Sequence, residues 1–231
     1  GLQLASIIKG FERTEKIVAL LSIKEFSQDS YIQFYTSQGM IKKTSLAEYE
    51  TIRTKIQACG LKDNDEVIGA ELISEDKEVM IITANGMSIK FNGSEVNPMG
   101  RIARGVKAIQ LKGDDRVIFG SQIDEDGDIV VVTDQGIAKR TPIAEYQCQG
   151  RGGIGFKTFS FYKNRANGRY ILGAFYVQNP FEIIMQQKDG TITRINTNDL
   201  PIAPRDGRGS TVIKIEDVDN TVEYVYRNYN E

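Results

Sequence analysis

One pattern occurs four times along this chain: an apolar β-rich run, a short polar turn that ends in glycine, and a second run that carries Lys or Arg. The copies are YIQFYTSQGMIKKT (31–44), VMIITANGMSIKF (79–91), IVVVTDQGIAKRT (129–141) and IIMQQKDGTITRI (183–195). Their turn glycines, Gly39, Gly86, Gly136 and Gly190, are 47, 50 and 54 residues apart. Apolar β-rich runs broken by a polar turn with glycine are typical of β-hairpins, so each copy predicts one hairpin.

A shorter stretch of alternating apolar and polar residues follows each hairpin. The stretches are KIQACGL (55–61), GVKAIQL (105–111), GFKTFSF (155–161) and GSTVIKI (209–215), and the opening GLQLASI (1–7) fits the same position. Their last residues, Ile7, Leu61, Leu111, Phe161 and Ile215, are 54, 50, 50 and 54 residues apart. Such alternation indicates half-buried strands, and we expect the chain to begin in the middle of a repeat.

Units of about 50 residues with roughly four strands each are typical of propeller-like arrays. No window sustains a helical apolar period over three turns, so the sequence predicts an all-β fold. We expect one domain over residues 1–231, with a blade remnant at about 1–25 and repeats at about 26–72, 73–122, 123–174 and 175–231.

The composition excludes several classes of protein. Hydrophobic residues make up 40% and charged residues 26% of the chain, and no apolar run approaches the roughly 18 residues of a membrane-spanning helix, so we expect a cytoplasmic protein. The chain has no histidine, which removes the usual general base and the commonest transition-metal ligand. Cys59 and Cys148 have no CxxC spacing and are expected to be free, buried thiols.

Basic residues recur at two positions of each unit. One set follows the hairpin glycine: Lys42, Lys43, Lys90, Lys139, Arg140 and Arg194. The other set lies before or just inside the alternating stretch: Arg53, Arg101, Arg104, Lys107, Arg151, Lys157, Arg205 and Arg208. Acids gather instead between the alternating stretch and the next hairpin, as at Asp63, Asp65, Asp114, Asp115 and the run 124–128. Equivalent positions of a circular array share an edge, so we expect one basic edge and one acidic edge.

A curved row of cations is suited to a polyanion that is bound through its backbone. Duplex DNA bent around the basic edge is the ligand we expect, with little sequence preference, because many weak phosphate contacts can offset the cost of bending. The acidic run D-E-D-G-D (124–128) lacks the ligand order of a calcium loop and falls where a turn is expected, so no metal site is predicted. The aromatic residues Tyr162, Phe175, Tyr176, Tyr224 and Tyr226 have strand-like spacing, which favours core packing.

The glycine-rich stretch Gln149, Gly150, Arg151, Gly152, Gly153, Ile154, Gly155 contains a literal G-x-G-x-x-G. A dinucleotide site needs a helix directly after this loop, whereas FKTFSF reads as a strand. The stretch occupies the same position as PMGRIARGVKAI (98–109) and PRDGRGSTVIKI (204–215). We therefore interpret its glycines as a tight turn into a strand, with Arg151 directed outward.

Three runs, GMIKKTSLAEYETIR, PMGRIARGVKAIQLKGDD and GIAKRTPIAEYQCQGRGGIGFKT, resemble the C-terminal domain of the A subunit of bacterial type IIA topoisomerases. The resemblance covers essentially the whole chain; it favours the A subunit of DNA gyrase, with ParC of topoisomerase IV as the alternative. It implies a β-pinwheel, a disc whose blades exchange strands and whose basic rim binds and bends duplex DNA. Residues 149–155 resemble a diverged copy of the gyrase Q-R-R-G-G-[RK]-G box, and the box itself is expected upstream of Gly1.

The resemblance also implies what the domain works with. It would be a non-catalytic part of an ATP-dependent enzyme that introduces negative supercoils, with the cleaving tyrosine and the use of ATP and Mg²⁺ in other parts of the holoenzyme. No cofactor is expected in this domain. The expected partners are duplex DNA, the B subunit, and the N-terminal part of the same polypeptide, with nucleoid association and no membrane. The alternatives are a topoisomerase IV domain for decatenation or relaxation and a protein-binding β-propeller.

Overall fold

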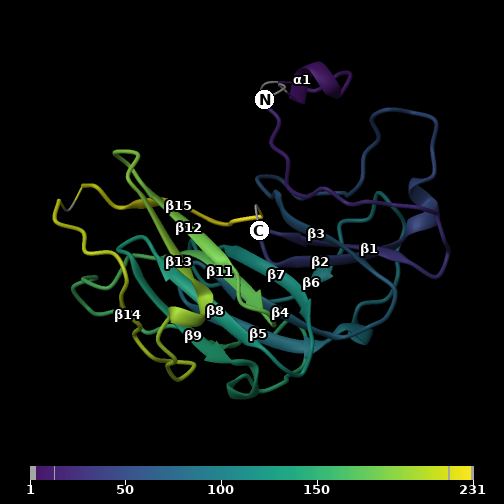
Figure 1. Ribbon diagram of the computed structural model, residues 1–231. Coiled ribbons are helices and arrows are strands. Elements are labelled where there is room, and N and C mark those ends of the chain that lie inside the picture. Colours follow the sequence, from purple (N-terminus) through teal and green to yellow (C-terminus); the bar gives the residue numbers. More distant parts are fainter. Residues whose placement is uncertain (1–3, 13, 218, 230–231) are drawn as a thin grey trace.

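Four antiparallel hairpins form the centres of four β-sheets (Figure 1). The computed structural model describes residues 4–12, 14–217 and 219–229. The hairpins are β1 (Tyr31–Thr36) with β2 (Met40–Ser45), β4 (Glu78–Thr83) with β5 (Met87–Asn92), β8 (Asp128–Thr133) with β9 (Ile137–Pro142), and β12 (Glu182–Gln187) with β13 (Ile192–Asn196). The four turn glycines have φ values between 65° and 89°, a region that favours glycine, so the predicted hairpins are confirmed.

A third strand pairs with the first strand of each hairpin. These strands are β3 (Val67–Ile73), β7 (Val117–Ile123), β11 (Ile171–Val177) and β15 (Val222–Arg227). β3 packs on β7, β7 on β11 and β11 on β15, so the blades follow one another in the order of the sequence. We number them blades 1 to 4.

A fourth strand of two residues reaches blades 1 to 3 from the following repeat. The exchanged strands are β6 (Val106–Lys107) on β2, β10 (Phe156–Lys157) on β5 and β14 (Ser210–Thr211) on β9. The turn glycine completes each junction: the carbonyl of Gly86 accepts hydrogen bonds from the backbone N–H groups of Thr158 (2.7 Å) and Phe159 (3.3 Å). Each blade is thus fastened to the next one, and the predicted all-β pinwheel of four-stranded blades is confirmed.

Neither 55–61 nor the described part of the expected strand 1–7 forms a strand, and residues 1–3 lie outside the described residues. Residues 55–61 have no regular secondary structure, and Leu4–Ile7 form the short helix α1, in a segment that stands apart from the sheets (Figure 1). An exchanged strand pairs with the hairpin of the preceding blade, and no described hairpin precedes β1, so these segments have no ladder partner for their backbone groups. Blade 4 has three strands within the described ranges, and β13 is its open edge.

The hydrophobic core is divided among the blade interfaces. Between blades 1 and 2 it contains the fully buried Tyr35, Ile81, Phe91 and Ile109, and similar clusters lie between blades 2 and 3 and between blades 3 and 4. Each fully buried side chain of this kind contributes about 1.5–3 kcal/mol to stability. The interfaces therefore fix the spacing from one blade to the next.

One 3-10 turn leads out of each hairpin. The turns are η1 (Leu46–Tyr49), η2 (Gly93–Glu95), η3 (Ile143–Glu145) and η4 (Thr197–Asp199). In η2 and η4 an asparagine side chain caps the turn by accepting from the backbone N–H two residues further on (2.9 Å in both). These turns direct the chain into the loops that carry the second set of basic residues.

Both cysteines are free, as predicted, but their expected burial is wrong for Cys148. Cys59 is half-buried beside the core of blade 1, whereas Cys148 is exposed because it lies in the loop after η3. Of the described helices, none is long and apolar enough to span a membrane.

Candidate nucleic-acid interface

The predicted cations separate into two sets with different surroundings. We call the first set the strand cations: Lys42, Lys43, Lys90, Lys139, Arg140 and Arg194 lie on β2, β5, β9 and β13. We call the second set the loop cations: Arg53, Arg101, Arg104, Lys107, Arg151, Lys157, Arg205 and Arg208. All loop cations are exposed or half-buried, whereas three strand cations are buried.

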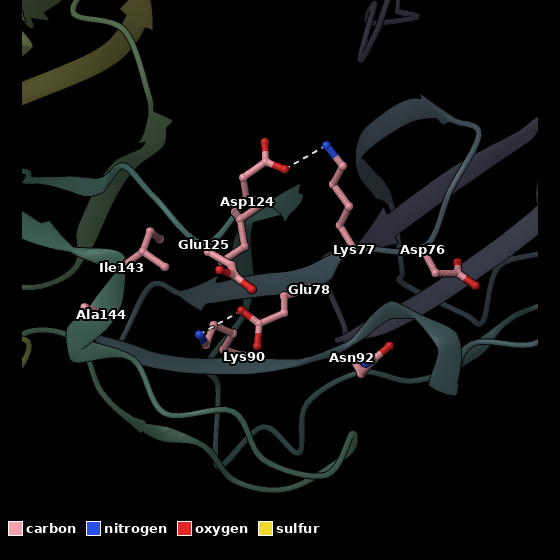
Figure 2. Close-up of a pocket in the computed structure, with 10 residues that line it drawn as sticks. Asp76, Lys77, Glu78, Lys90, Asn92, Asp124, Glu125, Ile143 and Ala144 are labelled. Atoms are coloured by element: carbon pink, nitrogen blue, oxygen red, sulfur yellow. Dashed lines mark ion pairs between the residues drawn. The ribbon is translucent and has the colours of Figure 1, made fainter.

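Four strand cations form ion pairs with carboxylates of their own blade or its outgoing turn. The pairs are Lys43–Asp76 (2.6 Å), Lys90–Glu78 (2.8 Å), Arg140–Asp128 (3.4 Å) and Arg194–Glu182 (3.9 Å). In the last three, the acid is the first residue of the hairpin and the cation lies diagonally opposite on the second strand. Figure 2 shows Lys90 and Glu78 facing each other at a hollow of about 550 Å³. The repetition of these cations therefore has a structural cause within the hairpin.

Lys139 is fully buried, so this structure does not place it on a DNA-binding rim. Its Nζ donates to the backbone carbonyls of Pro204 and Arg205, both at 2.6 Å. Burial lowers the pKa of Lys139 to about 8, against an opposing attraction from Asp206. The lysine holds the arginine loop of the next unit against blade 3.

Lys42 has the equivalent role in blade 1. It is 1% exposed, and its Nζ donates to the carbonyls of Ala58 (3.1 Å) and Arg101. Burial lowers the pKa of Lys42 as well. The corresponding residue of blade 2 is Ile89, which has no group to donate, and the loop that follows that hairpin is the glycine-rich stretch. The expectation that Lys42, Lys43 and Lys139 face a ligand does not hold, because their charges are used inside the fold.

Three loop arginines repeat one contact at successive blade boundaries. The guanidinium of Arg151 donates to the carbonyl of Lys107 (2.5 Å), and the corresponding pairs are Arg101 with Gln57 and Arg205 with Lys157. Each acceptor is the third residue of the alternating stretch one unit earlier. At two of these boundaries the guanidinium group therefore lies against the backbone of a lysine, and Arg151 also donates from its Nε to the carbonyl of Glu95 (3.3 Å).

The backbone of each arginine loop is also fastened to the preceding blade. Met99, Gln149 and Ala203 donate their N–H groups to the carbonyls of Lys43, Lys90 and Arg140 (2.8–2.9 Å). The carboxylates of Glu48 and Glu95 accept from the backbone N–H groups of Arg101 (2.7 Å) and Arg151 (2.9 Å). The loops that carry Arg101, Arg151 and Arg205 are therefore anchored to the preceding blade.

The glycine-rich stretch 149–155 is a tight turn that leads into β10. Gly155 has φ 72°, and a Cβ there would lie 2.2 Å from the carbonyl oxygen of Ser88. Gly152 has φ 82° and donates its N–H to the carbonyl of Ala108 (2.8 Å), whereas Gly150 has open space around it. The closest backbone approach in this stretch is thus to the neighbouring blade.

Asp65, Asp115 and Asp124, three of the acidic residues between the repeats, have structural partners. The carboxylate of Asp65 accepts from the hydroxyl of Ser37 and the N–H of Gln38, and that of Asp115 accepts from the N–H of Asn85, all at 2.9 Å. In the run 124–128, between β7 and β8, Asp124 pairs with Lys77 (2.7 Å; Figure 2). Among the described residues, no group of three or more His, Cys, Asp or Glu side chains could hold a metal ion.

The sequence prediction passed over one basic group, formed by Lys163, Arg165 and Arg169 with the nearby Arg116. These residues lie where the other repeats carry acids, between the alternating stretch and the next hairpin. Comparing the charge of the four corresponding segments would have found the group, because only 162–169 is positive.

The fold and the cationic loops define a class: a strand-exchanging β-propeller whose blade boundaries carry arginines on anchored loops. The family model described as the DNA gyrase C-terminal domain, beta-propeller, matches residues 34–74, 77–124, 127–161 and 188–222. The chain belongs to this family.

Similar proteins and structures agree with this assignment. The chain is 45% identical over 87% of its length to the DNA gyrase A protein of Clostridium acetobutylicum, and 32% identical over 100% to that of Mycobacterium tuberculosis. It covers 24% and 27% of these relatives, so it spans about a quarter of their length. A crystal structure of the C-terminal domain of DNA topoisomerase IV has a TM-score of 0.90 at 31% identity, covering 97% of this chain and 70% of the other. A DNA gyrase A C-terminal domain shares the fold, with a TM-score of 0.80 at 21% identity and coverage of 97% and 74%.

Proposed function

We propose that this domain binds duplex DNA along its loop cations and bends it around the blades. The observation that carries this proposal is the repeated arginine contact at the blade boundaries, seen at Arg101, Arg151 and Arg205. This hydrogen bond to a backbone carbonyl holds a guanidinium group at the equivalent position of successive units. A duplex presents phosphates at regular intervals, so a regular row of cations fits its backbone.

The anchoring of the loops favours binding in energetic terms. A guanidinium that is already held by a backbone carbonyl loses little further freedom when it meets a phosphate. Each neutralised phosphate releases counterions and adds to affinity at low salt. Bending a site of 20–30 base pairs costs of order 1–6 kcal/mol, which several such contacts offset. Because the contacts go to the backbone, we expect little sequence preference.

The domain would act within the A subunit of a type IIA topoisomerase, with DNA gyrase as the favoured parent enzyme. In that setting it is a non-catalytic module that wraps DNA for negative supercoiling. Strand cleavage and the use of ATP and Mg²⁺ would belong to the B subunit, together with the N-terminal part of the polypeptide that carries this domain. The protein would work at the nucleoid in the cytoplasm. The identity to gyrase A proteins supports this choice of parent.

The second candidate is the equivalent domain of topoisomerase IV, where it would select substrates for decatenation or relaxation. The observation in its favour is the close structural likeness to a topoisomerase IV domain. The two candidates differ in whether the bound DNA follows a chiral path.

Ligation of nicked plasmid in the presence of the domain, at fixed low salt, tests the proposal. A positive change in linking number that grows with protein concentration is the result expected for chiral wrapping in a gyrase. Binding without a change in linking number would mean achiral bending and would favour topoisomerase IV. An absence of binding would contradict the proposal and favour a protein-binding propeller.

A further inference from the structure

The segment that joins blade 2 to blade 3 differs in charge from its counterparts. Between the alternating stretch and the next strand, the segments 62–66, 112–116 and 216–221 carry formal charges of −2, 0 and −3, whereas 162–170 carries +3. We call residues 162–169 the junction loop. Its cations are Lys163, Arg165 and Arg169, and all three are exposed.

The fold explains how this reversal is possible. In blades 1 and 2, Asp65 and Asp115 of the corresponding segments accept a hydrogen bond from a backbone N–H of the hairpin turn. In blade 3 the carboxylate belongs to a residue of the hairpin turn: Asp134 accepts a hydrogen bond from the backbone N–H of Arg169 (2.8 Å). The junction loop therefore needs no aspartate for this hydrogen bond, and it can carry basic residues instead.

The junction loop lines a hollow of about 360 Å³, which we call the junction hollow. Lys157, Lys163 and Arg165 line it together with the aromatic residues Phe161 and Tyr162, and no carboxylate does. No ion pair formed by the described residues involves these three cations. An adjoining hollow shares Arg165 and adds Arg116 and Arg169, with Asp114 as its one lining acid.

Aromatic rings hold the guanidinium groups around these hollows. Arg165 lies over Phe161 (5.1 Å), Arg208 over Tyr162 (4.7 Å) and Arg116 over Tyr170 (5.8 Å). A guanidinium stacked on a ring by its face keeps its N–H edge free for an anion.

The position of Tyr162 corrects a prediction from its spacing. It is 41% exposed beside the loop cations rather than packed in the core. The same prediction is wrong for Tyr224 and Tyr226, which are exposed on β15. In contrast, Phe175 and Tyr176 pack partly buried against the cores between blades, as expected.

We propose that the junction hollow binds phosphates of duplex DNA where the duplex leaves the row of loop cations. This inference rests on the proposed function. The hollow is continuous with that row. Lys157 lines the hollow, and its backbone carbonyl accepts a hydrogen bond from the guanidinium of Arg205. Arg208 lies over the ring of Tyr162, which also lines the hollow. A flexible lysine pair beside fixed guanidinium groups suits a sugar–phosphate backbone rather than one defined small ligand.

The position of the hollow affects the path of the bound duplex. None of the three other corresponding segments is positive, and 62–66 and 216–221 are acidic, so this side of the blades attracts phosphates at one junction only. The DNA path then leaves the plane of the loop cations at the boundary of blades 2 and 3.

The test compares two double variants of the 231-residue chain in duplex binding at several salt concentrations. K163Q/R165Q removes two cations of the junction hollow, and K62Q/K112Q removes two cations from the corresponding segments as a matched control. Duplexes of increasing length are used, with polyglutamate as a competing acidic polymer. With long duplexes we expect K163Q/R165Q to reduce the magnitude of the slope of log affinity against log salt by about 2. With the shortest duplexes it should leave the slope unchanged.

Each outcome has one meaning. A smaller slope for K163Q/R165Q, on long duplexes only and with K62Q/K112Q like the wild type, supports the inference. Equal slopes for both variants and the wild type overturn the inference while leaving the proposed function intact. Loss of polyglutamate binding by K163Q/R165Q without a change in DNA binding overturns it in favour of an acidic protein partner. If the wild type binds no duplex in a salt-dependent manner, the proposed function itself fails.

Discussion

Replacing Lys139 by methionine tests whether this lysine is a buried structural charge. In the fold the pKa of Lys139 falls from 10.5 to about 8, because burial disfavours the ammonium form. Between these two values the unfolded chain binds a proton that the folded chain does not, so the free energy of unfolding rises with pH. At 1.36 kcal/mol per pKa unit, the full gain is about 3 kcal/mol.

The assay is urea unfolding of the wild type and K139M at a series of pH values from about 7 to 10, the window that spans the folded-state pKa. The difference between the two proteins isolates the lysine, since all other titrating groups are shared. We expect the wild type to gain stability relative to K139M by about 2–3 kcal/mol over this range. If the free energies of unfolding of the wild type and K139M changed in parallel with pH, Lys139 would not be a buried charge and would belong to the exposed cations.

Three further predictions concern the loops and the buried polar groups. G155A should destabilise the domain by about 2 kcal/mol or more in urea unfolding, because its φ is 72° and the added Cβ meets a carbonyl, while G150A should cost under about 0.5 kcal/mol. The pKa of Glu71 is raised by burial, so the wild type should lose stability relative to E71Q as the pH rises above about 4.5; identical pH profiles would contradict this. Cys148, which is exposed, should react with a thiol reagent in the native state faster than the half-buried Cys59, and equal rates would refute the placement of the loop.

The hairpins could be predicted from the sequence because their signals are local. The turn glycine, the apolar run before it and the repeat of about 50 residues lie within one stretch of chain at each copy. The absent strand at 55–61 could not be predicted in this way, because its pairing depends on a hairpin of another unit. A pattern of alternation shows that a strand is possible, whereas a partner decides whether it forms.

The two roles of the cations were partly accessible to sequence reasoning. Adjacent strand residues point to opposite faces, so Lys42–Lys43 and Lys139–Arg140 could not both face one rim. That rule puts the two members of each pair on opposite faces, but it does not show that Lys42, Lys43 and Lys139 are all buried. The carbonyls that accept from Lys42 and Lys139 come from loops 16 to 66 residues away. The basic junction loop was visible as a charge difference between equivalent segments.

The salt dependence of duplex binding is the most direct test of the claim that loop cations, not strand cations, contact DNA. Two triple variants are compared with the wild type after each is shown to melt cooperatively: R53Q/R104Q/K107Q for the loops and K43Q/K90Q/R140Q for the strands. Each phosphate contact contributes roughly 0.9 to the magnitude of the slope of log affinity against log salt. We therefore expect this magnitude to fall by about 3 in the loop variant and to stay at the wild-type value in the strand variant. A smaller slope for the strand variant, with the loop variant unchanged, would contradict the claim.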